Sequence, residues 1–129
     1  MFTIDSLSRQ PLYEQLIEQL ERLVLTGVLE PGSRIPTVRG LSCELSVNPN
    51  TIQKAYSDLD RRGVICSVPG RGCYITDQAV TLLRQERQRF LPLLEDQLRR
   101  LKLAGIGRER IEALLDQVYP ISEEGGQQP

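Results

Sequence analysis

Any chemistry in this chain has to proceed without histidine, because none of its 129 residues is His. The commonest general base and the usual nitrogen ligand of metals are therefore missing, and neither a Ser/His/Asp nor a Cys/His set can form. Carboxylate pairs stay chemically possible, but none falls outside a predicted helix surface. The sequence thus predicts a protein that is not an enzyme, with no catalytic residues, no metal site and no cofactor.

The three cysteines, Cys43, Cys66 and Cys73, are too few for a disulfide scaffold and too scattered for a metal site. Cys66 and Cys73 fall on the two strands of a predicted hairpin. With Val68 opposite Cys73, their Cα atoms are expected to lie roughly 7 to 8 Å apart, too far for an easy disulfide. A redox switch is therefore the less favoured alternative, and a reducing cytoplasm is the expected location.

A cluster of amide and hydroxyl side chains follows a helix start signal in the middle of the chain. Asn48 and Pro49 are a typical N-cap and first-position pair, and Asn50, Thr51 and Gln53 come shortly after them. A helix that begins here presents free N–H groups and the positive end of its dipole, which favour phosphate. The amide of Gln53 can offer one donor and one acceptor to an adenine edge. These residues are suited to reading a DNA groove.

The elements that must position this cluster follow the order of a winged helix-turn-helix. Apolar periodicity and turn signals predict helices over residues 10–27, 38–45 and 49–62, and strands over residues 64–68 and 73–76. Thr37 caps the second helix, Gly63 ends the third, and Arg71 lies at the hairpin tip. In such a fold the third helix enters the major groove with its N-terminus first. The expected fold class is mainly α with a small β-hairpin.

A second helical region after the hairpin has apolar stripes without a partner. Helices are predicted over residues 78–104, interrupted at Pro92, and over residues 108–119. Two helices of these lengths cannot bury both stripes against each other, so a second copy of the chain is expected. The residues expected at this dimer contact are Leu83, Phe90, Leu91, Leu94, Leu98, Leu101, Ile111, Leu114, Leu115 and Val118. The expected organisation is a DNA-binding domain over residues 1–77, a helical dimerisation region over 78–120 and a disordered tail over 121–129.

Charge is informative only by segment. The whole chain has a formal net charge of -1, which favours neither nucleic acid nor an acidic membrane. Residues 33–75 alone contain six basic and three acidic side chains, a net charge of +3, and the rest of the chain carries -4. The first residues include an early acid, Asp5, and no basic start, so no secretory leader is expected, and no apolar run reaches about 18 residues. No membrane partner is expected.

Four ordered motifs within residues 8–77 carry a family resemblance. They are Pro11-Leu12-Tyr13-Glu14-Gln15, the segment LEPGSRIPTVR over 29–39, Val47-Asn48-Pro49-Asn50-Thr51 with Ala55-Tyr56, and Gly70-Arg71-Gly72. This part of the chain resembles the DNA-binding domain of the GntR family of bacterial transcription regulators. The short two-helix C-terminal part and the Asn-Pro-Asn-Thr sequence are similar to the YtrA-type subfamily, whose members are small dimeric regulators.

The resemblance implies DNA contacts at the positions that match the family motifs. Arg34 and Arg39 match arginines before and within the second helix, and Arg71 and Gly72 match a wing tip that reaches the minor groove. Tyr56 matches a phosphate contact, although its ring equally suits the core. The implied DNA-binding residues are Arg34, Thr37, Arg39, Asn48, Pro49, Asn50, Thr51, Gln53, Lys54, Tyr56, Arg71 and Gly72. The chain departs from the family at Gly40, where glutamate is usual, and at Cys73, where threonine or serine is usual.

The resemblance implies a homodimeric, sequence-specific repressor that acts near its own operon. Regulators of this subfamily are often associated with operons that encode transporters. Its expected partners are a pseudo-palindromic double-stranded DNA operator and a second copy of itself. A small effector, of unidentified chemistry, would have to bind in a small cavity between the C-terminal helices or at the dimer interface. The alternative is a winged-helix module that uses its basic face for an acidic protein partner and does not read DNA.

Overall fold

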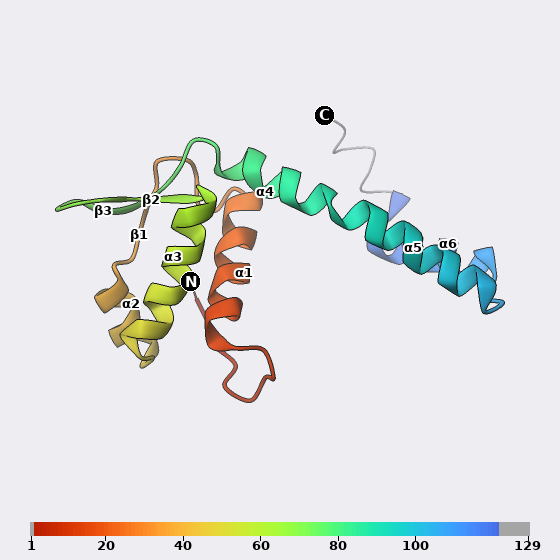
Figure 1. The fold of residues 1–129 in the computed structure, drawn as a ribbon, viewed down its shortest axis with the longest axis horizontal. Helices are drawn as coiled ribbons and strands as arrows, with labels where there is room; N and C mark the ends of the chain where they lie inside the picture. The colour runs from red at the N-terminus through yellow and green to blue at the C-terminus, as the bar shows by residue number, and fades with distance from the viewer. Residues whose placement is uncertain (1, 122–129) are drawn as a thin grey trace. The chain divides into compact units, whose positions relative to one another are not determined.

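The computed structural model describes residues 2–121, and the expected tail beyond Ile121 lies outside the described residues. The chain forms two compact units, of which the first ends at Gln88 and the second begins at Arg89. In chain order the elements are α1 (Leu12–Leu25), β1 (Arg34–Ile35), α2 (Val38–Leu45), α3 (Pro49–Arg62), β2 (Ile65–Val68), β3 (Gly72–Ile75), α4 (Ala79–Gln88), α5 (Phe90–Leu103) and α6 (Arg108–Val118) (Figure 1). The fold is a winged helix, mainly helical with a small antiparallel sheet.

The core of the first unit lies where α1, α3 and α4 meet the sheet. Its fully buried side chains include Leu20 of α1, Ile52 and Leu59 of α3, and Ile75 of β3. Leu83 of α4 is also fully buried in this core. Because α4 packs here, the first unit extends beyond residue 77, where the sequence places the domain boundary. Leu83 was expected at a dimer contact, and this expectation is wrong because its side chain is enclosed within one chain.

Caps fix the two helices of the helix-turn-helix at the predicted residues. The hydroxyl oxygen of Thr37 accepts a hydrogen bond from the backbone N–H of Gly40 (3.0 Å), and the side-chain oxygen of Asn48 accepts one from Asn50 N–H (2.8 Å). Pro49 occupies the first position of α3, where its missing N–H has no helical role. Gly63 ends α3 with φ of +86°. The predicted bounds of α2 and α3 are therefore confirmed.

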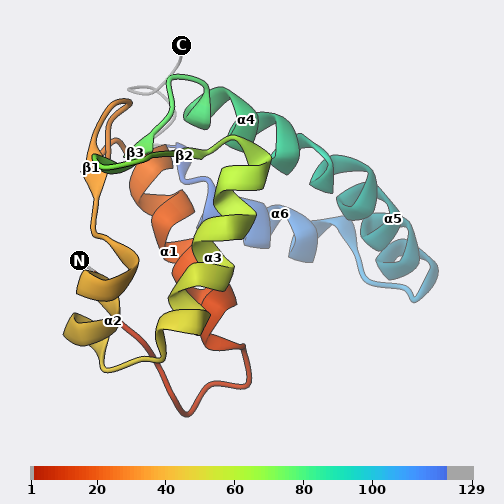
Figure 2. The same cartoon turned by 60° about the vertical axis from the view of Figure 1, so that its left-hand side comes forward.

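The sheet differs from the predicted hairpin in two ways. It has a third strand, because Arg34 and Ile35 pair with Tyr74 and Cys73 of β3, in a segment expected to be only a connector. A two-residue strand is too short to show the alternation that identifies strands in a sequence. The strand order is β1-β3-β2, and Figure 2 shows this sheet at the upper end of α1 and α3, with α2 at their lower end.

The register of the hairpin also differs by one residue from the prediction. Ser67, and not Val68, lies opposite Cys73, because Val68 pairs with Gly72 and closes a three-residue loop. Cys66 pairs with Tyr74, so the side chains of Cys66 and Cys73 leave opposite faces of the hairpin. All three cysteines are free thiols. This register removes the geometric basis for a disulfide between the two strands.

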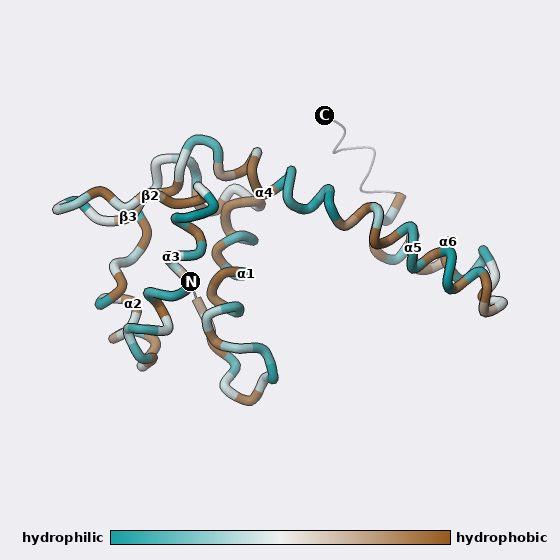
Figure 3. The backbone as a smooth tube through the Cα atoms, viewed as in Figure 1, coloured by the Kyte–Doolittle hydropathy of each residue, from teal (hydrophilic) through white to brown (hydrophobic). Residues whose placement is uncertain are grey.

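The second unit is a pair of helices with exposed apolar faces. Pro92 lies in the first turn of α5, so the expected interruption of the long helix at this proline is confirmed. Not one residue of α5 or α6 is buried within the described chain. Figure 3 shows apolar residues recurring along both helices. The unit therefore has almost no core of its own.

Candidate nucleic-acid interface

The N-terminal end of α3 presents the predicted polar side chains to solvent. Asn48, Asn50, Gln53 and Lys54 are exposed, and Thr51 is half-buried. The side-chain oxygen of Asn48 is used by the cap, which leaves its amide nitrogen for an outside acceptor. The inward face of α3 is buried, so the helix is held by its core side while its polar side stays free. This is the arrangement that a recognition helix requires.

Gln53 is oriented by the next turn of the same helix. Its side-chain nitrogen donates a hydrogen bond to the hydroxyl of Ser57 (3.0 Å). One amide N–H and the amide oxygen remain, which is the donor and acceptor pair that an adenine edge accepts. Ser57 was not among the predicted site residues, although its i, i+4 spacing from Gln53 was a usable signal.

Lys54 is steadied by an aromatic ring from α1. Its ammonium nitrogen lies 3.9 Å from the centre of the Tyr13 ring. Such a cation–π contact orders the side chain without neutralising its charge. Tyr13 falls within a motif that carries the family resemblance, but nothing in the sequence assigns its ring to Lys54, which is far along the chain. Its role as a support for Lys54 is visible only in three dimensions.

The wing brings two predicted residues together. A β-carbon placed on Gly72 would lie 3.1 Å from Nε of Arg34, so the guanidinium of Arg34 rests against the bare backbone of Gly72. Gly72 also has φ of +109°, a conformation that side chains with a β-carbon rarely adopt. At the tip, the hydroxyl of Tyr74 donates to the carbonyl of Arg71 (3.0 Å), and the Arg71 side chain is exposed. Figure 1 shows the hairpin extending away from the helices.

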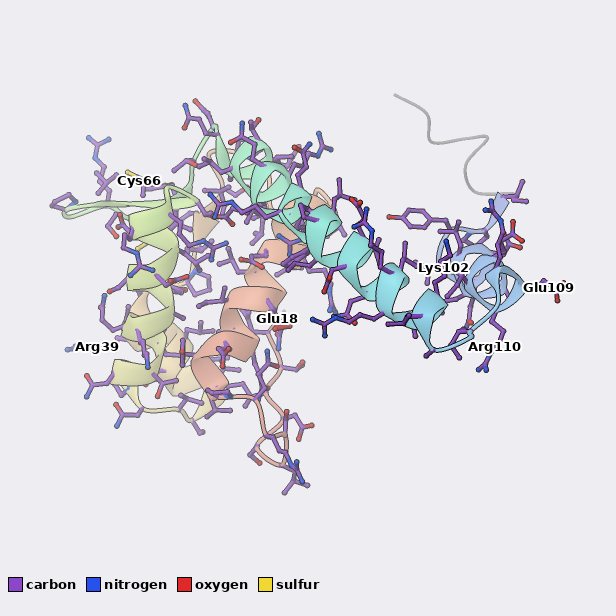
Figure 4. The ribbon with its side chains drawn as sticks, turned by 45° about the vertical axis from the view of Figure 1, so that its right-hand side comes forward. Glu18, Arg39, Cys66, Lys102, Glu109 and Arg110 are labelled. Carbon is purple, nitrogen blue, oxygen red and sulfur yellow. The ribbon has the colours of Figure 1, made fainter. Side chains whose placement is uncertain are left out.

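Residues 33–75 contain six basic side chains, and four of them form no ion pair with a carboxylate of the described residues 2–121. Arg39 is exposed on α2, and Figure 4 shows it at the outer edge of the first unit. The unpaired cations are Arg34, Arg39, Lys54 and Arg71. The remaining two, Arg61 and Arg62, are both bound to Asp58. The positive charge available to DNA is therefore concentrated on α2, the start of α3 and the wing.

Tyr56 lies in the core instead of on the interface. Its side chain is 4% exposed, and its hydroxyl donates to the carbonyl of Pro36 (2.6 Å). Burial raises the pKa of Tyr56 above its ordinary value. The only proton that the hydroxyl could donate to a phosphate is thus already committed within the chain. A direct phosphate contact by Tyr56 does not fit this arrangement, and the core interpretation does.

Within residues 2–121, no three Cys, Asp or Glu side chains lie in a group that could hold a metal ion. No helix in that range has both the length and the apolar character needed to cross a bilayer.

Comparisons with known proteins agree with this geometry. A family model described as "Bacterial regulatory proteins, gntR family" matches residues 12–75. The "HTH-type transcriptional repressor YtrA" of Bacillus subtilis is 36% identical over an alignment of 122 residues, which covers 92% of this chain and 92% of the relative. A GntR family transcriptional regulator from Listeria monocytogenes has the same fold, with 30% identity, a TM-score of 0.70 and coverage of 88% of this chain and 98% of the other. The DNA-binding domain of AraR, solved in complex with operator ORX1, is 31% identical, with a TM-score of 0.52 and coverage of 58% of this chain and 93% of the other. This family and these relatives are transcription regulators and not enzymes.

Proposed function

The chain belongs to the GntR family of bacterial regulatory proteins, in its YtrA-type subfamily, and from this premise we propose that it is a homodimeric repressor that binds operator DNA. The observation that carries the proposal is the set of unpaired cations around the polar start of α3. Asn48, Asn50 and Gln53 offer hydrogen bonds to base edges, while Arg39, Lys54 and the wing offer positive charge to the phosphates on either side. The operator complex of the AraR DNA-binding domain, a relative with this fold, supports the same docking.

The dimer is supported by the apolar faces of α5 and α6. Phe90, Leu91 and Leu94 of α5, and Leu114 and Leu115 of α6, are each more than half exposed. A groove of about 720 Å³ in this unit is lined by Leu98, Ile111 and Leu115 among others. These faces are too large for one chain to leave in water, so we assign them to a second copy of the same unit. Twofold symmetry then places two copies of α3 about 34 Å apart, on the two halves of a pseudo-palindromic operator.

Repression of the chain's own operon is the regulatory form of the proposal. The relative from Bacillus subtilis is named as a repressor, and this relative matches almost the whole chain. We propose by analogy that the operator lies upstream of the chain's own gene, in an operon that includes a transporter.

A gel-shift titration tests the proposal directly. The probe is the promoter region upstream of the chain's own gene, and unlabelled random duplex is the competitor. We expect a shift that survives competitor DNA, because base contacts add to the electrostatic contribution to affinity. A shift that competitor abolishes, or none at all, favours the protein-interaction module instead.

Two arginine variants with a matched control locate the interface. Arg39→Ala and Arg71→Ala should each weaken binding roughly tenfold and leave the melting temperature nearly unchanged, since both side chains are exposed. Arg84→Ala removes an equally exposed arginine from α4, which lies away from α2 and the wing (Figure 2). The control should bind like the wild type. Equal affinities for all four proteins would contradict the docking.

A further inference from the structure

One guanidinium joins the end of the recognition helix to two other helices. Arg62, in the last turn of α3, contacts Glu86 of α4 through Nε (3.2 Å) and Nη2 (2.6 Å). The same side chain binds Glu21 of α1 through Nη2 and Asp58 of its own helix through Nη1 (3.0 Å). Arg87 of α4 binds the other oxygen of Glu21 (3.1 Å). We call Arg62, Glu21, Asp58, Glu86 and Arg87 the α4 clamp.

The centre of the α4 clamp is sheltered from water, whereas the side chains of Glu86 and Arg87 on α4 are 33% and 40% exposed. The side chain of Glu21 is 10% exposed and that of Arg62 is 20% exposed. Three carboxylates around one guanidinium raise the pKa of Arg62, with Glu86 as the largest cause. A partly buried, bidentate arginine pair is far more directional than a single exposed ion pair. The α4 clamp can therefore fix the position of a helix, which the surface pairs of α5 and α6 cannot do.

The clamp acts where α4 has no apolar anchor. The first half of α4 is held by Ala79 and Leu83, both fully buried, but none of residues 84–88 is buried. Glu86 and Arg87 are thus the contacts that hold the last turn of α4 to α3 and α1. The second unit begins immediately after this turn, at Arg89. The last turn of α4, from which the chain continues into the second unit, is therefore held to the winged helix by ion pairs and not by buried apolar side chains.

We propose that Arg62 is a positioning residue that holds the last turn of α4 and thereby sets which half-site spacing the dimer accepts. This inference rests on the proposed function, a homodimer on a two-part operator. Arg62 lies at the opposite end of α3 from Asn50, some 18 Å away along the helix axis at about 1.5 Å per residue. Loss of the clamp therefore leaves the base contacts of each head unchanged and loosens only the link between the head and the dimer. A dimer with loosely held heads binds several spacings with similar affinity.

The test compares binding to operators of different spacing. The probes are duplexes selected by the wild-type full chain from a random library, then remade with the centre lengthened or shortened by a few base pairs, together with a single half-site. Arg62→Met removes the guanidinium at the centre of the clamp and leaves only the pair of Arg87 with Glu21 between α4 and α1. Glu86→Gln weakens the contact of Arg62 with α4, and it keeps Arg62 paired with Glu21 and Asp58 should Arg62→Met fail to fold. Arg61→Met is the matched control, because Arg61 also binds Asp58 but has no ion pair with α4 in the described chain.

For the wild type and Arg61→Met, we expect affinity to fall by about tenfold or more when the spacing changes. For Arg62→Met and Glu86→Gln, the fall should be about threefold or less, with half-site affinity within about threefold of the wild type. A purely stabilising role would lower the melting temperature and leave the spacing profile intact. Wild-type spacing profiles in both clamp variants would overturn the proposal.

Amide hydrogen exchange separates this inference from the proposed function. Without DNA, amides of residues 84–88 should exchange about tenfold faster in Arg62→Met and Glu86→Gln than in Arg61→Met, because the last turn of α4 opens locally. If the wild type selects no DNA, the proposed function fails, and the role of Arg62 in half-site spacing fails with it. Hydrogen exchange would still show whether the clamp holds the last turn of α4. Equal exchange in all variants overturns the clamp itself.

Discussion

At the scale of single residues, the missing β-carbons of Gly72 and Gly40 allow neighbouring side chains of the wing and of α2 to take their positions. Gly72 allows the guanidinium of Arg34 to rest on the wing backbone, and Gly40 allows the hydroxyl of Thr37 to cap α2. In each case a β-carbon would come within 3.1 Å or less of the neighbouring side chain. The two glycines therefore provide room for close contact with the side chains of Arg34 and Thr37.

Gly72→Ala should weaken operator binding by about tenfold, because the new methyl group pushes Arg34 away from the wing. The positive φ adds a strain of roughly 1 to 2 kcal/mol to the folded state. Gly70→Ala is the control, since Gly70 also has a positive φ but a β-carbon placed on it would meet no neighbouring atom within 4 Å. Fluorescence anisotropy with the selected operator measures the difference. Equal losses in the two variants would show that backbone strain, and not Arg34, is responsible.

Gly40 and Thr37 should be coupled in stability. A β-carbon on Gly40 would lie 2.9 Å from Oγ1 of Thr37, the atom that caps α2. Gly40→Ala gains about 1 kcal/mol of helix propensity but disturbs a cap that contributes about 1 kcal/mol, so its net effect should be small. In a Thr37→Ala background the cap is already lost, and the same substitution should stabilise by the full amount. Urea unfolding of the four proteins measures this cycle, and additive effects would rule out the coupling.

At the scale of elements, the helices were predictable because their signals are local. Asn48, Pro49 and Gly63 define both ends of α3 with no help from the rest of the chain. Strand β1 was not predictable, because it pairs with β3, which lies far away in the sequence. The hairpin register was not predictable either, because a change of one residue in loop length shifts every pair of the hairpin. The cation–π contact of Tyr13 with Lys54 and the α4 clamp were not predictable, since each joins segments that are distant in sequence. Leu83 was wrongly predicted at the dimer contact, because the spacing of apolar residues along a helix is the same for a face buried in a core and for one buried in an interface.

The break between α4 and α5 is caused by Pro92. A proline has no N–H, so the carbonyl of Gln88, four residues earlier, receives no helical hydrogen bond from position 92. Pro92→Ala restores this donor and should extend the helix across Arg89, the single residue between α4 and α5, which NMR measures as a shift of the Arg89 Cα and carbonyl resonances toward helical values. Pro36→Ala, outside any helix, serves as the control. Unchanged Arg89 resonances in Pro92→Ala would mean that another residue causes the break.

At the scale of the whole molecule, the two units differ in how much apolar surface each buries within one chain. The winged helix has a closed core and can fold on its own contacts, whereas α5 and α6 expose their apolar faces. If the dimer forms as proposed, the stability of the second unit depends on protein concentration, while that of the first does not. DNA affinity then depends on dimerisation, because a symmetric operator is bound well only by two linked heads.

Leu94→Asp therefore tests the dimer, because it places a charge on the apolar face of α5 twice in each symmetric assembly. We expect dimer dissociation to be favoured by about 100-fold or more, measured by sedimentation equilibrium. Half-site binding should stay as in the wild type, and binding to the full operator should fall to that level. Leu103→Asp is the matched control: Leu103 is 89% exposed on the same helix, and nine residues at about 100° each place it opposite Leu94. A dimer that survives Leu94→Asp, or dissociates equally with Leu103→Asp, would show that this face does not join the two chains.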